Sequence, residues 1–174
     1  MQVDLSLGGN VIQAIPWLDQ LLLVSASSAR FAFVFLFVPL FSTQVMPATV
    51  RNSIIITLGL VAYVLQTQFL PRELSAAAWS VLLMKEAAAG VIIGIFFGTI
   101  MWAMTAAGEL IDTKVGATIG QLVDPLSGAQ SSLTGILMGR FAQVIFVSAG
   151  GLTLLVGTVM ESYVIWPMGP GQSS

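Results

Sequence analysis

Long apolar runs alternate along the chain with short polar connections. About 20 apolar residues in a helix cross the roughly 30 Å of hydrocarbon in a bilayer. Four runs reach this length, at about 17–41, 53–70, 81–107 and 133–160. Backbone polar groups in lipid must be satisfied internally, and the continuous apolarity favours helices over alternating strands. The pattern predicts an all-α membrane protein, one domain over residues 1–174, with about four long hydrophobic helices in hairpins.

Composition and charge narrow the possible functions. The chain is 56% hydrophobic and only 8% charged, with a mean hydropathy of +0.94, whereas soluble domains carry about 25% charged residues. Its net charge of -2 offers no basic surface, so nucleic acid is excluded as a partner. Histidine and cysteine are absent, which removes most nucleophiles, bases and soft metal ligands. We expect no enzyme activity, no cofactor and no metal.

The ends of the apolar runs say less about topology. The first 13 residues include Asp4 but no lysine or arginine, so they lack the basic flank of a cleaved signal peptide. We therefore expect the apolar runs to remain in the mature protein. Lysine and arginine are spread over the connections, which leaves the membrane orientation open.

Small residues recur at helical spacing in the third and fourth runs. Gly90, Gly94 and Gly98 follow one another at four-residue intervals, and Gly135 and Gly139 repeat the interval. Such a stripe lets another backbone approach closely, which predicts a helix-packing face. Small residues are also common in membrane helices, so a dedicated contact with another subunit stays open beside ordinary packing.

Two arginines lie within the apolar runs. Arg30 is near the centre of the first, and Arg140 lies eight residues into the fourth. A central arginine costs about 2.5–3.5 kcal/mol on insertion scales, so neither side chain should face lipid unless it reaches a headgroup. That reach is plausible for Arg140 and awkward for Arg30. For Arg30 we expect an ion pair or carbonyl contact rather than contact with cargo, with Glu86, Glu109 or Glu161 as candidate partners.

The longest polar stretch, GELIDTKVGATIGQLVDPLSGAQSS, occupies residues 108–132. Glu109 and Asp112 are three apart on one helical face, while Gly116 and Gly120 interrupt a longer helix. A turn follows at VDPLSG. The many aliphatic residues favour a loop buried in a cavity or against other subunits, and a loop lying on the headgroups is the alternative.

These residues resemble a known family. The stretch GELIDTKVGATIGQLVDPLSG, together with Arg30, PLF at 39–41, Pro47 and Arg51, resembles the SctT/FliR family, the T subunit of the type III secretion export apparatus. The spacing from Arg30 to Arg51 and the GAT and DPLSG elements are more similar to the virulence injectisome branch than to the flagellar one.

The resemblance implies a non-enzymatic subunit of the export gate in the bacterial inner membrane. In that family the T subunit assembles with R and S subunits, and with the U subunit, into a conduit for unfolded secreted proteins. A plug loop closes the pore until secretion begins. Its residues correspond here to Gly116, Ala117, Thr118, Ile119, Gly120, Leu122, Val123, Asp124, Pro125, Leu126 and Gly128. Assembly or structural polar contacts are expected at Arg30, Arg51, Glu86, Glu109, Asp112 and Arg140.

Family members are longer and end in further hydrophobic segments, whereas this chain stops at GPGQSS. We therefore expect a truncated or split form without the C-terminal hairpin. Two other functions are weighed. A small-solute transporter calls for internal repeats, which are not evident. An intramembrane serine hydrolase using Ser127, Ser131 or Ser132 would need Lys114 as its base.

Overall fold

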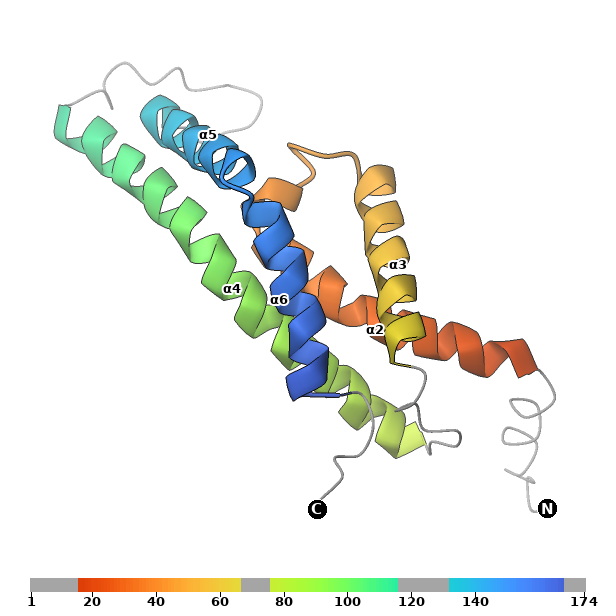
Figure 1. The fold of residues 1–174 in the computed structure, drawn as a ribbon. Coiled ribbons are helices and arrows are strands. Elements are labelled where there is room, and N and C mark those ends of the chain that lie inside the picture. Colours follow the sequence, from red (N-terminus) through yellow and green to blue (C-terminus); the bar gives the residue numbers. More distant parts are fainter. Residues whose placement is uncertain (1–15, 67–75, 116–131, 168–174) are drawn as a thin grey trace, which may run out of the picture.

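Helices make up the ordered framework of the protein. The structure is a computed structural model that describes residues 16–66, 76–115 and 132–167. Within these ranges it has five α-helices, one 3-10 turn and no strand, which confirms the prediction of an all-helical fold (Figure 1). The elements are α2 (Pro16–Phe37), η1 (Pro39–Phe41), α3 (Ala48–Leu65), α4 (Ala76–Val115), α5 (Leu133–Ser148) and α6 (Gly151–Ile165).

Prolines set the boundary between the first two long helices. Helix α2 ends at Phe37 because Pro39 disfavours a helical backbone at Val38, which is extended with φ -90° and ψ 114°. Pro39 then opens η1, where its missing N–H is not needed. Pro47 is the N-cap of α3. The predicted first helix, which extended to residue 41, therefore stops four residues earlier.

Helix α4 is the longest element, with 40 residues. It begins before and ends after the predicted limits of 81–107. Residues 87–108 carry no charge, so its charged groups lie toward the two ends. Its last described residue is Val115, directly before the glycines that were expected to interrupt it.

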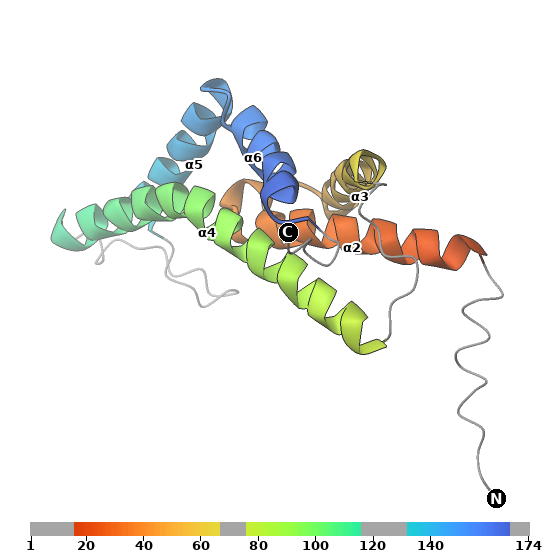
Figure 2. The same ribbon diagram turned by 60° about the horizontal axis from the view of Figure 1, so that its bottom comes forward.

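The fourth predicted helix is wrong as a single element. Residues 133–160 belong to two helices, α5 and α6, whose axes differ by 70°. The break falls at Gly150, whose φ of +80° lies in the left-handed region that glycine enters without a steric penalty. Figure 2 shows the two helices as an inverted V over α4.

The packing is organised around α4. Its first half lies against α2, its second half lies beside α5, and α3 packs on α2. Both ribbon views show α2 and α4 crossing near the end of α6 (Figures 1 and 2). The core joins these elements through a buried apolar cluster that includes Phe31, Phe35, Phe41, Phe97, Met101, Leu155, Val159 and Tyr163. Phe35 and Phe41 stack with 3.7 Å between ring centroids, which anchors η1 to α2.

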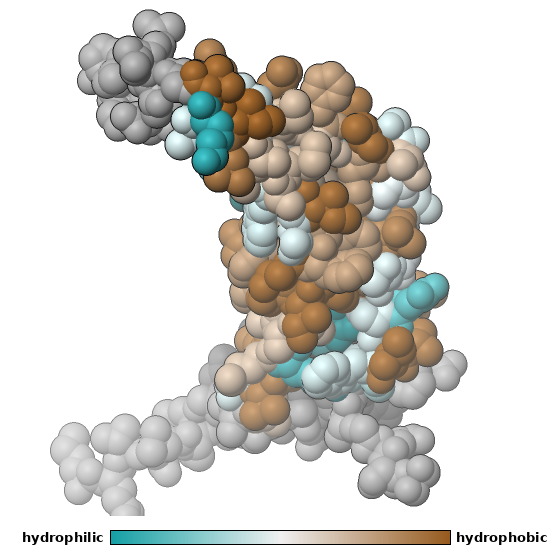
Figure 3. Space-filling view, turned by 90° about the vertical axis from the view of Figure 1, so that its left-hand side faces the viewer, coloured by the Kyte–Doolittle hydropathy of each residue, from teal (hydrophilic) through white to brown (hydrophobic). Residues whose placement is uncertain are grey.

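Much of the outer surface is apolar. Among the described residues, three helices are long and apolar enough to cross a membrane, or four spans are present if α5 and α6 count as one bent span. Only 11% of the apolar window in α3 is buried within the chain. Figure 3 shows one side of the molecule with extensive hydrophobic surface and few strongly hydrophilic patches. Surfaces of this kind require lipid or other protein subunits to cover them.

Candidate functional site

Glycines bring α2 and α4 into backbone contact. An added Cβ at Gly90 would lie 2.5 Å from the carbonyl oxygen of Arg30, and one at Gly98 would lie 2.4 Å from that of Phe37. Gly94 faces Phe37 and Val34 in the same way. No side chain fits at such distances without separating the helices. The glycine stripe of α4 therefore serves a contact within this chain.

A buried ion pair lies at the crossing of α2 and α4. Nε of Arg30 donates to Oε2 of Glu86 at 2.8 Å, and Nη2 donates to Oε1 at 2.9 Å. Both side chains are fully buried, and this is the one ion pair in the described part of the chain. The paired geometry matches the planar guanidinium to the carboxylate. Of the three candidate partners, Arg30 contacts Glu86.

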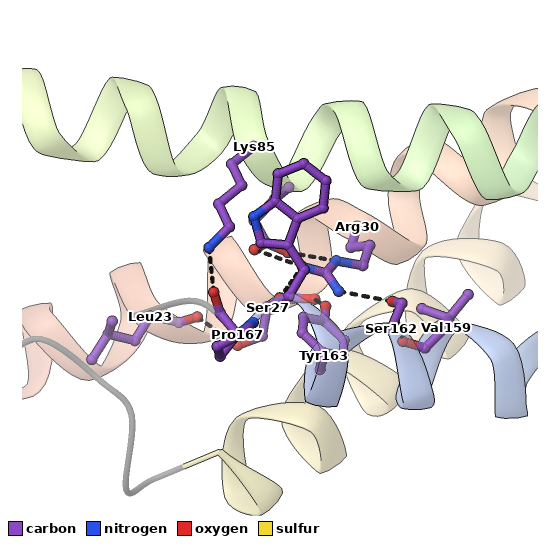
Figure 4. A network of polar contacts seen from close by, with 10 residues as sticks. Leu23, Ser27, Arg30, Lys85, Val159, Ser162, Tyr163 and Pro167 are labelled. Carbon is purple, nitrogen blue, oxygen red and sulfur yellow. Dashed lines mark hydrogen bonds and ion pairs between the residues drawn. The ribbon is translucent and has the colours of Figure 1, made fainter. Parts of the chain in front are cut away.

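Helix α6 completes the surroundings of Arg30 (Figure 4). Nη1 donates to Oγ of Ser162 at 2.8 Å, and Nη2 donates to the carbonyl oxygen of Trp166 at 3.1 Å. The Tyr163 ring lies 3.8 Å from Cζ of Arg30, and the Tyr163 hydroxyl donates to the carbonyl oxygen of Ser27 at 2.7 Å. These contacts attach the end of α6 to both other helices.

Lys85 extends this polar cluster toward the surface. Its Nζ donates to the carbonyl oxygen of Pro167, and it lies 5.8 Å from the centroid of the Trp166 ring. Because a buried charge is costly without a partner, the number of contacts around Arg30 matters. Here the guanidinium makes four hydrogen bonds, so the cluster is a satisfied structural junction rather than an open binding site.

A second polar cluster lies at the opposite end of α4. One carboxylate oxygen of Asp112 accepts from the Ser132 hydroxyl at 2.5 Å and from the Thr134 backbone N–H at 3.1 Å. The other accepts from the Thr134 hydroxyl. Ser132 also caps α5, since its Oγ accepts from the N–H of Gly135 at 2.9 Å. We call Asp112, Ser132 and Thr134 the Asp112 clasp.

Close packing supports the clasp. A Cβ at Gly108 would lie 2.6 Å from the Cα of Gly135, so the two backbones touch there. One turn away, a Cβ at Gly139 would lie 2.5 Å from the hydroxyl oxygen of Thr105. The second glycine pair found in the sequence therefore meets α4, with Gly108 as a counterpart that the spacing did not reveal.

The Arg30–Glu86 cluster and the Asp112 clasp lie at the two ends of one stretch of α4, and the bent pair α5 and α6 connects the same two places. Glu86 and Asp112 are 26 residues apart on α4, which is about 39 Å along a helix. Two arms of about 24 and 22 Å, the lengths of α5 and α6, span about 38 Å when bent by 70°. The bend at Gly150 therefore lets the return path reach both ends of this stretch.

The other residues that were predicted to make polar contacts make fewer of them. Nη1 of Arg51 makes a long contact of 3.5 Å with the carbonyl oxygen of Phe41. Glu109 is exposed, with its side chain beside Gly135. Arg140 is exposed and donates to Oε1 of Gln143 at 3.2 Å. The predicted plug residues between 116 and 128 lie outside the described residues.

Several site residues were not identified from the sequence. Ser132, which directly precedes an apolar run, carried a usable signal because serine is a preferred N-cap. Ser162, Tyr163 and Trp166 carried none, because their role depends on the path of α6 after the bend.

An open apolar groove of about 420 Å³ lies between α2 and α3. Its lining includes Ser25 and Ser28, whose hydroxyls donate to the carbonyl oxygens of Leu21 and Val24 on the same helix, at 2.7 Å each. Both hydroxyl protons are thus used within α2. The groove has an apolar lining without convergent charged groups, so it gives no support to binding of a polar solute.

The described helices form an extended frame with apolar outer faces, two internal polar junctions and three or four potential membrane spans. The family described as Bacterial export proteins, family 1, matches residues 21–174. The chain belongs to this family, which is the SctT/FliR family expected from the sequence, and to its injectisome branch.

Individual relatives agree with this assignment. The chain is 34% identical over 135 residues to the surface presentation of antigens protein SpaR of Salmonella typhimurium, covering 78% of this chain and 51% of SpaR. It is 33% identical over 141 residues to the Yop proteins translocation protein T of Yersinia pestis, covering 80% and 54%. The flagellar biosynthetic protein FliR of Bacillus subtilis is 29% identical over 135 residues, covering 77% and 51%. The chain spans about half the length of these curated relatives.

Proposed function

We propose that the chain is a non-enzymatic T subunit of a type III secretion export gate in the bacterial inner membrane. It would form part of the channel for unfolded proteins together with R, S and U subunits. Membership in the bacterial export family supports this role, as do relatives whose names refer to Yop translocation and to antigen presentation at the surface.

The Asp112 clasp is the observation that carries the proposal. A steric plug must be anchored at both ends, or it cannot return to the same closed position. Asp112 on α4 binds Ser132 and Thr134 at the start of α5, so the two helices that flank residues 116–131 in the sequence are held together. In the proposed gate the aliphatic residues of this segment exclude water, and its glycines allow bending.

The exposed apolar faces support assembly with other subunits. Val144 on α5 and Phe96 on α4 are 66% and 72% exposed, and α3 is covered mainly on one side. A polypeptide with such surfaces requires lipid, companion helices or both.

Co-purification tests the proposed place of the chain. The tagged chain would be produced in cells that hold the other secretion genes and lack the native T subunit. Membranes would then be extracted, and the co-eluting proteins identified. We expect R and S subunits to elute with the chain in a complex. Elution of the intact chain without them would contradict the proposal, as would saturable uptake of a small solute by the chain alone in vesicles.

A further inference from the structure

Helix α5 has two unlike faces. Its small residues Gly135, Gly139 and Ala142 are buried toward α4. Large apolar side chains cover the opposite side, including Leu137 at 54% exposure and Val144 at 66%. At about 100° per residue, Arg140 lies about 40° from Val144 and about 60° from Leu137 around the helix, and along the axis it lies between them. The outward face of α5 is therefore an apolar surface with a guanidinium near its middle.

Arg140 has no acidic partner among the described residues. Its contact is with Gln143 on the same helix, at 3.2 Å. Side chains on a helix ordinarily lean toward its N-terminus, which here is the polar end at Ser132. Gln143 lies in the other direction, so it holds the guanidinium toward the apolar part of the helix.

A positive charge in this position needs a counter-charge from beyond the described residues. Hydrocarbon does not solvate a guanidinium, and a neutral amide satisfies only part of its five-donor fork. A carboxylate matches that fork with two hydrogen bonds. The apolar residues around Arg140 also match the side of another membrane helix better than a solvated loop.

We propose that the outward face of α5, centred on Arg140, is an interaction surface for a membrane helix of another subunit. That helix presents an aspartate or glutamate within an apolar stretch. The inference rests on the proposed assembly of the chain with other membrane subunits, but it does not depend on the plug. The competing occupant is a lipid, whose phosphate would meet Arg140.

Substitutions at Arg140 separate the two occupants. Arg140→Leu, Arg140→Glu and the control Leu154→Val, on the exposed side of α6, would be produced with the complete secretion system, and the intact membrane complex would be quantified. We expect the two Arg140 variants to lower its recovery at least about tenfold, because they leave the partner carboxylate unpaired. Leu154→Val should match wild type. Equal or better recovery with Arg140→Leu would overturn the proposal in favour of lipid.

Folding and assembly can be measured separately. The helical content and membrane recovery of each variant chain, purified alone in detergent, should equal those of wild type. If the Arg140 variants lost helical content in this state, their loss of complex would reflect misfolding, and the surface assignment would be rejected.

A cross-link then identifies the partner. A photoreactive residue at Leu137, with Leu154 on α6 as the control position, would be activated in cells that hold the assembled system. We expect a Leu137-specific adduct on a peptide from a membrane helix that contains Asp or Glu. Exchanging charges, with Arg140→Glu and that acidic residue changed to Arg, should restore recovery of the complex. Lipid adducts alone, or a failed exchange, would overturn the proposal.

The proposed function can fail independently. If wild-type chain elutes without other secretion subunits, the proposed function is wrong and this surface with it. If wild type and Arg140→Leu assemble equally well, only the surface is wrong.

Discussion

Helix α4 meets α2 in its first half and α5 in its second, and glycines bring the backbones together in both places. The polar groups beside the glycines differ. In the first half, Glu86 forms a fully buried ion pair with a residue 56 positions away and joins three helices. In the second half, Asp112 binds hydroxyl and amide groups 20 and 22 positions away, at the start of the next helix.

The two junctions therefore differ in how easily they can open. Removing one partner of a buried ion pair leaves an unpaired charge in the core, so the first junction resists opening. In the Asp112 clasp a single buried carboxylate binds neutral, partly buried donors, so opening it leaves no second charge unpaired. The fold therefore places its most rigid junction far from the proposed plug and its more exchangeable junction directly beside it.

Breaking the buried Arg30–Glu86 ion pair should have the greatest effect on stability. We expect Arg30→Leu or Glu86→Leu alone to lower the free energy of unfolding by about 3–5 kcal/mol. The double variant should lose less than either single variant, because no charge is left unpaired. Thermal unfolding of the purified chain in detergent checks this order. A loss in the double variant equal to the sum of the two single losses would show that the charges are not coupled.

Arg30→Leu also sharpens the distinction between insertion and assembly. The variant should insert into membranes more readily, because a central arginine is removed. It should nevertheless assemble less well, because α6 loses its attachment to α2 and α4. Equal recovery of the complex from wild type and variant would count against this role.

The glycine contact between α2 and α4 gives the next largest effect. Gly98→Ala places a methyl group 2.4 Å from the Phe37 carbonyl oxygen, so α2 and α4 must separate. We expect a loss of about 1–3 kcal/mol in unfolding free energy. Gly157→Ala is the matched control, since nothing lies within 4 Å of its added Cβ, and it should be neutral or stabilising. Similar behaviour of the two variants would contradict backbone contact at Gly98.

The bend between α5 and α6 depends on Gly150. Alanine there must adopt a φ of +80°, which costs about 1–2 kcal/mol for a residue with a Cβ. There is free space around the position, so steric overlap adds nothing. Gly150→Ala should lower the unfolding midpoint modestly, and Gly157→Ala again serves as control. An unchanged midpoint would mean that the bend is not held in this conformation.

Opening the clasp should have only a local effect. In Asp112→Ala, the amides of Thr134 and Gly135 should exchange hydrogen faster, because the first turn of α5 loses its carboxylate acceptor. Exchange around Glu86 should remain at the wild-type rate. Thr113→Ala, which alters an exposed neighbour, is the control. Faster exchange throughout α4 would show that the clasp is part of the global core.

The sequence predicted the helices well because continuous apolar runs in lipid leave the backbone few alternatives. It missed the bend at Gly150, since hydropathy alone does not distinguish one long helix from two. Arg30 could be recognised as needing a partner from its position. The choice of Glu86 over Glu109 or Glu161 depended on the crossing of α2 and α4, which only tertiary packing determines.

Only part of the Asp112 clasp could be predicted from the sequence. Asp112 stood out as an acidic residue at the end of an apolar helix, and Ser132 preceded another. Their pairing across the intervening segment follows from the antiparallel contact at Gly108 and Gly135. Gly108 could not be paired from a single sequence, because it belongs to no four-residue repeat with its neighbours.

Ion conductance of the assembled complex tests the central claim most directly. Residues 116–128 would be shortened while Asp112, Ser132 and Thr134 are retained, and the resting complex would be compared with wild type in planar bilayers. We predict intact assembly and an open, conducting pore, because the steric block is removed and its anchor is kept. A shortened complex as tight as wild type would contradict the plug.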